Sequence, residues 1–80
     1  MKIAILGPGC RNCVTLERLA REAAADLGID AEVTKITDYG EIASYGIMST
    51  PGLVIDGEVV LSGRLPSGDE VRELIASRAG

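Results

Sequence analysis

Residues 7–13 read GPGCRNC and hold both cysteines of this 80-residue chain. The stretch joins a short apolar run, residues 3–6, to a segment with helical periodicity. A Cys-x-x-Cys pair at such a junction places its first sulfur among the free backbone N–H groups of the first helical turn, where the helix dipole favours an anion. Cys10 is therefore the sulfur best placed to be a thiolate. Cys13 lies one turn deeper on the same side of the helix, close enough to attack a mixed disulfide formed at Cys10.

Three other interpretations of the cysteine pair compete with a nucleophile and its resolving thiol. A structural staple is poorly placed here, because closing so short a loop removes only about 2 kcal/mol of chain entropy. Two buried cysteines acting as small hydrophobes are disfavoured, because Cys10 lies in a turn rich in Gly and Pro. A soft-metal site stays open, because two thiolates are good ligands for Cu(I).

Composition excludes several classes of function. The chain has a net charge of −4 with dispersed basic residues, so we expect no nucleic-acid partner. It contains no histidine, which removes Ser-His and Cys-His catalytic pairs and leaves two cysteines unable to complete a tetrahedral zinc site. The GPG loop at residues 7–9 lacks the later Gly of the dinucleotide fingerprint and the Lys of a P-loop. We therefore predict no cofactor and no zinc site, and the soft-metal alternative stays open.

Length and the N-terminal residues suggest a single domain in a reducing compartment. Eighty residues make one domain, so we expect residues 1–80 to fold as one unit. After Met1-Lys2 only four apolar residues precede Gly7, too few for a signal-peptide core, and no run approaches a membrane span. We expect a cytoplasmic location without membrane association. There, a cysteine pair is more often catalytic, redox-sensing or metal-binding than a permanent disulfide.

The first half of the chain predicts a βαβ unit. Residues 3–6 are apolar at every position, which indicates a central strand buried on both faces. Residues 12–27 carry apolar side chains at spacings of three and four, which predicts an amphipathic helix capped by Gly28. Residues 29–36 give a weaker strand pattern, suited to a sheet edge. The two strands should be parallel, with a right-handed crossover.

The second half predicts a short helix, a hairpin and a last helix. Residues 38–41 have capping-box spacing and open a helix of about two turns. Asp56-Gly57 between the β-branched runs 53–55 and 58–61 predicts a hairpin. Residues 67–70 repeat the capping-box pattern at the start of the C-terminal helix. The element order is βαβαββα, an α/β fold.

That order, with Cys-x-x-Cys at the first strand-to-helix junction and Thr50-Pro51 just before the third strand, resembles the thioredoxin fold. More narrowly, GPGCxxC at residues 7–13 and MSTPGLVIDG at residues 48–57 resemble the small redox-active disulfide proteins of prokaryotes, which are thioredoxin-like domains of about this length. The resemblance implies a four-stranded mixed sheet flanked by three helices.

In the implied sheet, strand 2–6 lies between a parallel strand near 30–36 and an antiparallel strand near 53–56. The second strand of the hairpin forms the far edge. By the same resemblance, the helices at 12–27 and 67–78 cover one face and the short helix covers the other.

The resemblance also assigns a substrate site at Thr50 and Pro51. The family's proline at this position is cis, and we carry this expectation to Pro51. A cis bond would hold the Thr50 backbone beside the sulfurs with its N–H and C=O free, so that an extended substrate pairs with it as an added strand. From the residues alone, Thr50-Pro51 simply starts a strand, where Pro is tolerated.

The chain departs from thioredoxins proper at three places. It has Gly9 where they carry an aromatic residue, and Ala4 where they carry a buried acid thought to help move the resolving thiol's proton. The resemblance therefore supplies no proton route for Cys13, and the missing acid argues against a general thioredoxin-like reductase. The intervening pair is Arg11-Asn12 in place of Gly-Pro. We expect the Arg11 guanidinium to favour the Cys10 thiolate and lower its pKa.

The resemblance thus implies a thiol–disulfide oxidoreductase in which Cys10 attacks and Cys13 resolves. Its partners would be a protein disulfide or dithiol substrate and a reductase that the sequence does not identify, and we expect a monomer. Two alternatives remain. Copper-chaperone domains also begin with a strand, a Cys-x-x-Cys loop and a helix, but they run βαββαβ and have Met where this chain has Pro8. A non-catalytic redox switch needs the same reactive thiol as an enzyme.

Overall fold

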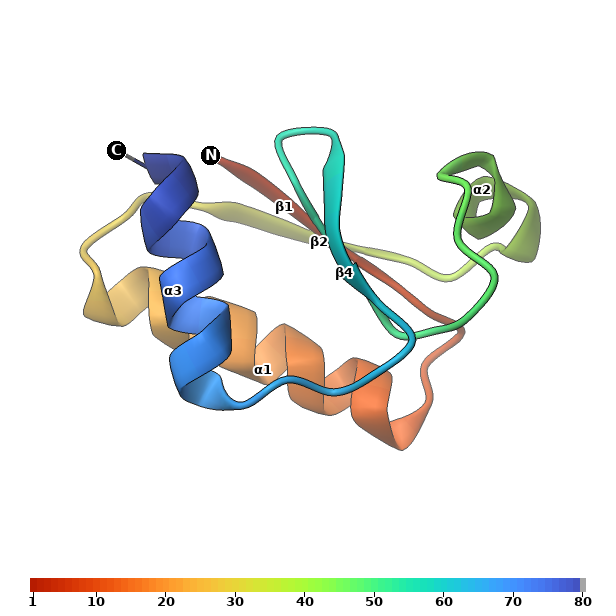
Figure 1. Cartoon of the computed structure of the whole chain (residues 1–80), viewed down its shortest axis with the longest axis horizontal. Helices are drawn as coiled ribbons and strands as arrows, with labels where there is room; N and C mark the ends of the chain where they lie inside the picture. Colours follow the sequence, from red (N-terminus) through yellow and green to blue (C-terminus); the bar gives the residue numbers. More distant parts are fainter. Residues whose placement is uncertain (80) are drawn as a thin grey trace.

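The structure is a computed structural model and describes residues 1–79. These residues form a four-stranded sheet and three helices (Figure 1). In chain order the elements are β1 (Lys2–Leu6), α1 (Arg11–Asp26), β2 (Glu32–Ile36), α2 (Tyr39–Ser44), β3 (Gly52–Ile55), β4 (Glu58–Ser62) and α3 (Gly68–Ala79). The predicted order βαβαββα is confirmed. The last described element is a helix, unlike the final strand of a copper-chaperone domain.

The sheet has the predicted strand order, β2-β1-β3-β4. The central strand β1 pairs parallel with β2 and antiparallel with β3, and β3 pairs antiparallel with β4. The sheet is therefore mixed, with β2 and β4 at its edges. Among residues 1–79, every helix is too short or too polar to cross a membrane.

Helices α1 and α3 pack together on one face of the sheet, and α2 covers the other (Figure 1). Alternate residues of β1 supply both faces, as expected for a central strand. Ile3 and Ile5 join the larger cluster, and Leu6 joins the smaller one, which also contains Ile42 and Val54. The larger cluster consists of Ile3, Ile5, Leu16, Ala20, Ala23, Leu53, Ile55, Val71 and Ile75.

The predicted strand at 29–36 was wrong at its start, because β2 begins only at Glu32. Gly28 has a φ of 68° and donates its N–H to Ala25 O, while Ile29 donates to Ala24 O at 2.9 Å. These two bonds form a Schellman motif that closes α1. Ile29 therefore belongs to the end of the helix and not to the strand.

The predicted hairpin turn at Asp56-Gly57 is confirmed. Both residues have positive φ, 49° and 85°, as the tightest hairpin turns require. Asp56 also ties the turn to the start of β1. Its backbone N–H donates to Lys2 O at 2.7 Å, and its Oδ1 accepts from Lys2 N–H at 2.8 Å.

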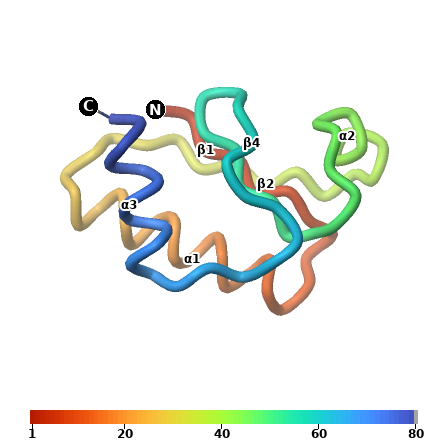
Figure 2. Tube along the Cα trace, viewed as in Figure 1, coloured from red at the N-terminus to blue at the C-terminus, as the bar shows by residue number. Residues whose placement is uncertain are grey.

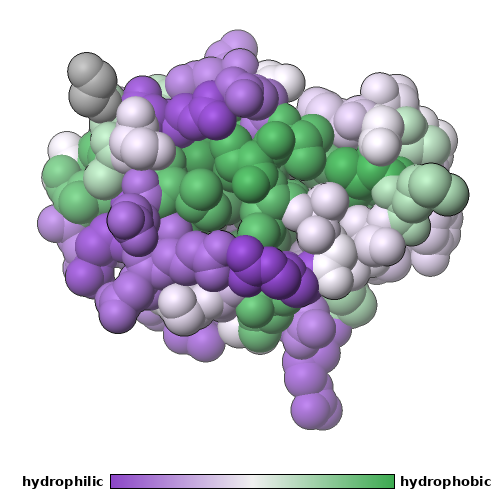
Figure 3. Space-filling view, viewed as in Figure 1, coloured by the Kyte–Doolittle hydropathy of each residue, from purple (hydrophilic) through white to green (hydrophobic). Residues whose placement is uncertain are grey.

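A β-bulge in β4 was not predicted. Leu53 pairs with Leu61 and Val54 with Val59, which leaves Val60 as the extra residue. As a result Val60 and Leu61 both pack against the larger cluster, whereas Val59 packs against the smaller one. These three side chains stay partly exposed. Figure 3 shows hydrophobic residues in the centre of the face that it displays, where β4 runs in Figure 1.

Three connections meet at one end of the sheet (Figure 2). They are the β1–α1 loop, the α2–β3 loop and the β4–α3 loop. The second and third are joined by a hydrogen bond from Gly63 N–H to Pro51 O at 3.0 Å. Both cysteines and the Thr50-Pro51 pair lie at this end.

Candidate active site

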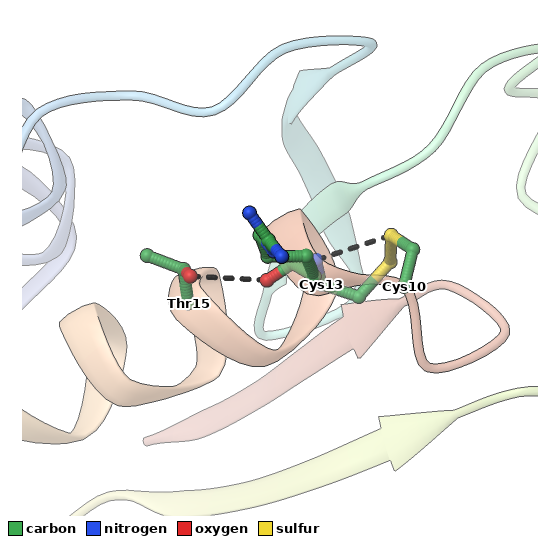
Figure 4. The surroundings of a disulfide bond; sticks show 4 residues. Cys10, Cys13 and Thr15 are labelled. Carbon is green, nitrogen blue, oxygen red and sulfur yellow. Dashed lines mark hydrogen bonds between the residues drawn. A yellow bond between two sulfur atoms is a disulfide. The ribbon is translucent and has the colours of Figure 1, made fainter.

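Cys10 and Cys13 form a disulfide at the start of α1, with their Cα atoms 5.0 Å apart. Cys10 is the N-cap residue of the helix, in an extended conformation. Its sulfur accepts the backbone N–H of Cys13 at 3.2 Å (Figure 4). This sulfur thus lies where the backbone N–H groups of the first turn point, as the sequence pattern indicated.

The two cysteines differ in their access to solvent. Cys10 is exposed, whereas Cys13 is only 4% exposed. The difference arises because Cys10 precedes the first turn of α1, while Cys13 lies on the helix face that packs toward the sheet. A macromolecular partner can therefore reach the sulfur of Cys10 but not that of Cys13.

Arg11 is the first residue of α1 and is exposed. Its carbonyl oxygen accepts a hydrogen bond from Thr15 Oγ1 at 3.0 Å, which supports the first turn (Figure 4). Its guanidinium forms no ion pair with any residue that the structure describes. The charge next to Cys10 is therefore not neutralised within residues 1–79.

Thr50 and Pro51 lie beside the disulfide. The Thr50–Pro51 peptide bond is cis. Pro51 is buried and Thr50 is exposed. A Cβ atom built on Gly7 would lie 3.8 Å from Thr50 Cβ and 2.2 Å from Cys13 Sγ, so the same backbone position borders both groups.

Gly7 is the site residue that sequence reasoning missed, since it was interpreted only as part of the loop at residues 7–9. It is buried, and its N–H donates to Ile36 O at 2.9 Å. The sequence shows only that the position is a glycine, a residue that permits close approach to the backbone without saying which group approaches. What approaches here is the sulfur of Cys13.

Three exposed apolar side chains belong to α1 and to the loops that meet at this end of the sheet. Met48 is fully exposed two residues before Thr50, and Val14 is 57% exposed immediately after Cys13. Leu65, in the loop that follows β4, is 37% exposed.

The position where thioredoxins proper carry a buried acid is apolar here. Ala4 lies on the face covered by α2 and lines a cavity of about 230 Å³, together with Thr34, Ile36, Tyr45 and Val54. Among residues 1–79, no polar or charged side chain is buried. Nor does this part of the chain bring together three or more His, Cys, Asp or Glu side chains that could hold a metal ion.

Comparison with known proteins agrees with this geometry. A family model described as a thioredoxin domain matches residues 1–76. The chain is 46% identical over 76 residues to a thioredoxin of Methanothermobacter thermautotrophicus, which covers 95% of this chain and 99% of that protein. It is 40% identical over 75 residues to a thioredoxin of Methanocaldococcus jannaschii, covering 94% and 86% of the two chains.

A solved structure shares the fold. Thioredoxin 1 from the thermophilic eubacterium Thermosipho africanus superimposes with a TM-score of 0.65 at 21% identity, covering 99% of this chain and 94% of that one.

Proposed function

Since this chain belongs to the thioredoxin family and is a thiol–disulfide oxidoreductase, we propose that Cys10 is its attacking thiol and Cys13 its resolving thiol. The observation that carries this assignment is the difference in exposure between the two cysteines. An attacking sulfur must reach a partner in solution, whereas a resolving sulfur needs to reach only Cys10.

The proposed reaction has two exchange steps. The Cys10 thiolate attacks one sulfur of a substrate disulfide, forms a mixed disulfide, and releases the other substrate sulfur as a thiolate, which takes a proton from solvent. The Cys13 thiol then loses its proton, and the resulting thiolate attacks Cys10 Sγ, forms the Cys10–Cys13 disulfide and releases the second substrate sulfur as a thiolate, which takes up a proton. Two electrons pass from the dithiol to the substrate, and the reverse sequence oxidises a substrate dithiol.

Two groups favour the thiolate at Cys10. The Cys13 N–H already points at this sulfur at 3.2 Å, and a hydrogen bond to an anionic sulfur is stronger than one to a neutral sulfur. The guanidinium of Arg11 follows directly in the chain and forms no ion pair with the described residues. A positive charge beside a cysteine at a helix N-terminus promotes its ionisation.

We assign substrate binding to Thr50 and Pro51. Thr50 is exposed beside the site, and an extended substrate segment would pair with its backbone as an added strand. The exposed side chains of Met48 and Val14 supply apolar contact area for such a segment. Pro51 is buried and its carbonyl accepts from Gly63, which anchors the loop that presents Thr50.

The proposed substrates are protein disulfides, as for other proteins of thioredoxin type. We further propose that the protein is a single-domain cytoplasmic monomer and that a separate reductase returns it to the dithiol form. In a reducing compartment a Cys-x-x-Cys pair is able to cycle, and a permanent disulfide is not expected there.

Trapping of mixed disulfides tests the two roles. The reduced Cys13→Ser and Cys10→Ser variants are each mixed with a model protein that carries one reducible disulfide, and the products are separated without reductant. Cys13→Ser should accumulate a mixed disulfide through Cys10, because no second thiol resolves it. Cys10→Ser should trap at least about tenfold less, because Cys13 is buried. Equal trapping by the two variants would contradict the assignment.

A further inference from the structure

We propose that Gly7 is a positioning residue for the resolving thiol, and that the space left by its missing side chain sets the equilibrium between the disulfide and the dithiol. The inference deepens the proposed function and rests on it for the role given to Cys13. It is carried by the 2.2 Å that would separate a Cβ at Gly7 from Cys13 Sγ. Cβ atoms in proteins essentially never approach another heavy atom so closely.

The backbone of Gly7 has little freedom to move away. Its N–H donates to Ile36 O at 2.9 Å and so extends the pairing of β1 with β2 by one residue. Leu6, the preceding residue, is fully buried in the smaller cluster. A side chain at position 7 would therefore have to be accommodated by movement of the sulfur.

Space alone requires a glycine at this position. The φ angle of Gly7 lies outside the left-handed region, so an alanine would adopt the backbone conformation without strain. Gly9 shows the opposite case: its φ is +97°, and nothing lies within 4 Å of a Cβ built there. The loop thus contains one glycine required by its backbone conformation and one required by the sulfur of Cys13.

The redox state decides whether that sulfur is able to move. In the disulfide, Cys13 Sγ is bonded to Cys10 Sγ and cannot rotate to another staggered position. In the dithiol the bond between the sulfurs is broken, and Cys13 is free to change its χ1 rotamer. A methyl group at position 7 should therefore destabilise the disulfide more than the dithiol, which makes the protein a stronger oxidant.

The first test is the redox equilibrium of the Gly7→Ala variant. The full chain is equilibrated with buffers of reduced and oxidised dithiothreitol, and free thiols are quantified after acid quenching. We expect the equilibrium constant for forming the disulfide to fall at least about tenfold, which corresponds to about 30 mV for a two-electron couple. A constant within twofold of the wild-type value would overturn the inference.

Gly52→Ala is the matched control, because it crowds the same end of the sheet without touching a sulfur. Gly52 pairs with Leu6, and a Cβ there would lie 2.9 Å from Ile47 Cδ1 and 3.3 Å from Leu6 Cβ. This variant should lose thermal stability equally in both redox states and keep the wild-type equilibrium within twofold. A shift as large as that of Gly7→Ala would show a general effect of crowding and overturn the assignment to Gly7.

A second measurement decides the question even if oxidised Gly7→Ala does not fold. Adding Gly7→Ala to a Cys13→Ala background leaves Cys13 Cβ, at 3.1 Å, as the nearest original contact. The loss of thermal stability should then be much smaller than in the oxidised wild-type background. An equal loss in both backgrounds would refute a contact with the sulfur.

The outcomes for Gly7 and for the proposed roles are separable. The redox equilibrium depends on the energies of the disulfide and the dithiol, and not on which sulfur attacks first. Equal trapping by Cys10→Ser and Cys13→Ser would therefore refute the roles while a shifted equilibrium still supports the inference about Gly7. Selective trapping with an unchanged equilibrium would refute the inference alone.

Discussion

The two faces of the sheet are packed very differently. Within residues 1–79, the face under α1 and α3 buries nine residues in one cluster, whereas the face under α2 buries three. The second face also has a cavity of about 230 Å³ beside Ala4, because a six-residue helix covers only part of it. Helix α1, which contains Cys13 and is capped by Cys10, thus rests on the face with the larger buried cluster, so the more extensively packed face supports the site.

Among the substitutions that test this comparison, Leu16→Ala should cause the largest loss of stability. Leu16 is fully buried on α1, one turn after Cys13, within the larger cluster. Its truncation should lower the free energy of unfolding by about 3–4 kcal/mol, because a dense site cannot collapse around the space left behind. Urea denaturation of the reduced protein measures the loss.

Ile42→Ala is the counterpart on the other face. Ile42 lies on α2 and is 5% exposed in the smaller cluster. We expect a loss of about 2 kcal/mol, because fewer packed neighbours surround it and α2 is able to shift toward the sheet. If Ile42→Ala cost as much as Leu16→Ala in the same urea titration, the two faces would not differ in the way proposed.

Filling the cavity on the less densely packed face should raise the stability, whereas the two truncations lower it. Ala4→Val adds two methyl groups to a partly buried position of β1 that borders the cavity. The variant should gain about 1 kcal/mol of stability, from added apolar burial and the preference of strands for β-branched residues. A loss of stability in the same assay would mean that Thr34, Val54 and Tyr45 leave no room for the added groups.

The smallest effect concerns the link between β4 and α3. Arg64 donates two hydrogen bonds to the Glu70 carboxylate, in the first turn of α3. The hydrogen bond from Arg64 is the main cause that lowers the pKa of Glu70 below its ordinary value of 4.5. Because the folded-state pKa is the lower one, this contribution to stability is present above pH 4.5 and is lost as the pH falls through the folded value.

Thermal unfolding from pH 7 to pH 3 checks the contribution of Glu70. Glu70→Gln should be slightly less stable than the wild type at pH 7, and the difference should shrink as the pH falls, because the wild-type carboxylate becomes protonated. Glu73→Gln is the matched control for the loss of one carboxylate, because Glu73 lies on the same helix and outside the ion pairs among residues 1–79. A difference for Glu70→Gln that stays constant with pH would argue against the ion pair as its source.

The elements of the fold were predictable wherever a local pattern determines them. The apolar run at residues 3–6 and the helical spacing after Cys10 specify β1 and α1 without reference to the rest of the chain. The start of β2 was not predictable, because the hydrogen bond from Ile29 to Ala24 competes with strand formation over the same residues. The bulge at Val60 depends on pairing with β3, which sequence periodicity does not encode.

The same distinction applies to the candidate site. The position of Cys10 at the N-cap follows from the spacing of the motif, so it was predictable. The close approach of Gly7 to the sulfur was not predictable, because its contact with Cys13 Sγ arises only when α1 packs back against the end of β1. The family resemblance supplied Thr50 and Pro51, which lie far from the cysteines in the sequence and reach them only through the sheet.

The sulfur of Cys10 is both the proposed reactive atom and the cap of α1, since it accepts the Cys13 N–H. Every chemical change at this sulfur, from thiolate to mixed disulfide to internal disulfide, alters the acceptor that the Cys13 amide proton meets. The chemical shift of the Cys13 amide in an NMR spectrum should therefore report the chemical state of the Cys10 sulfur. It would allow each stage of the exchange to be followed in the unlabelled active site, without a dye or a substrate analogue.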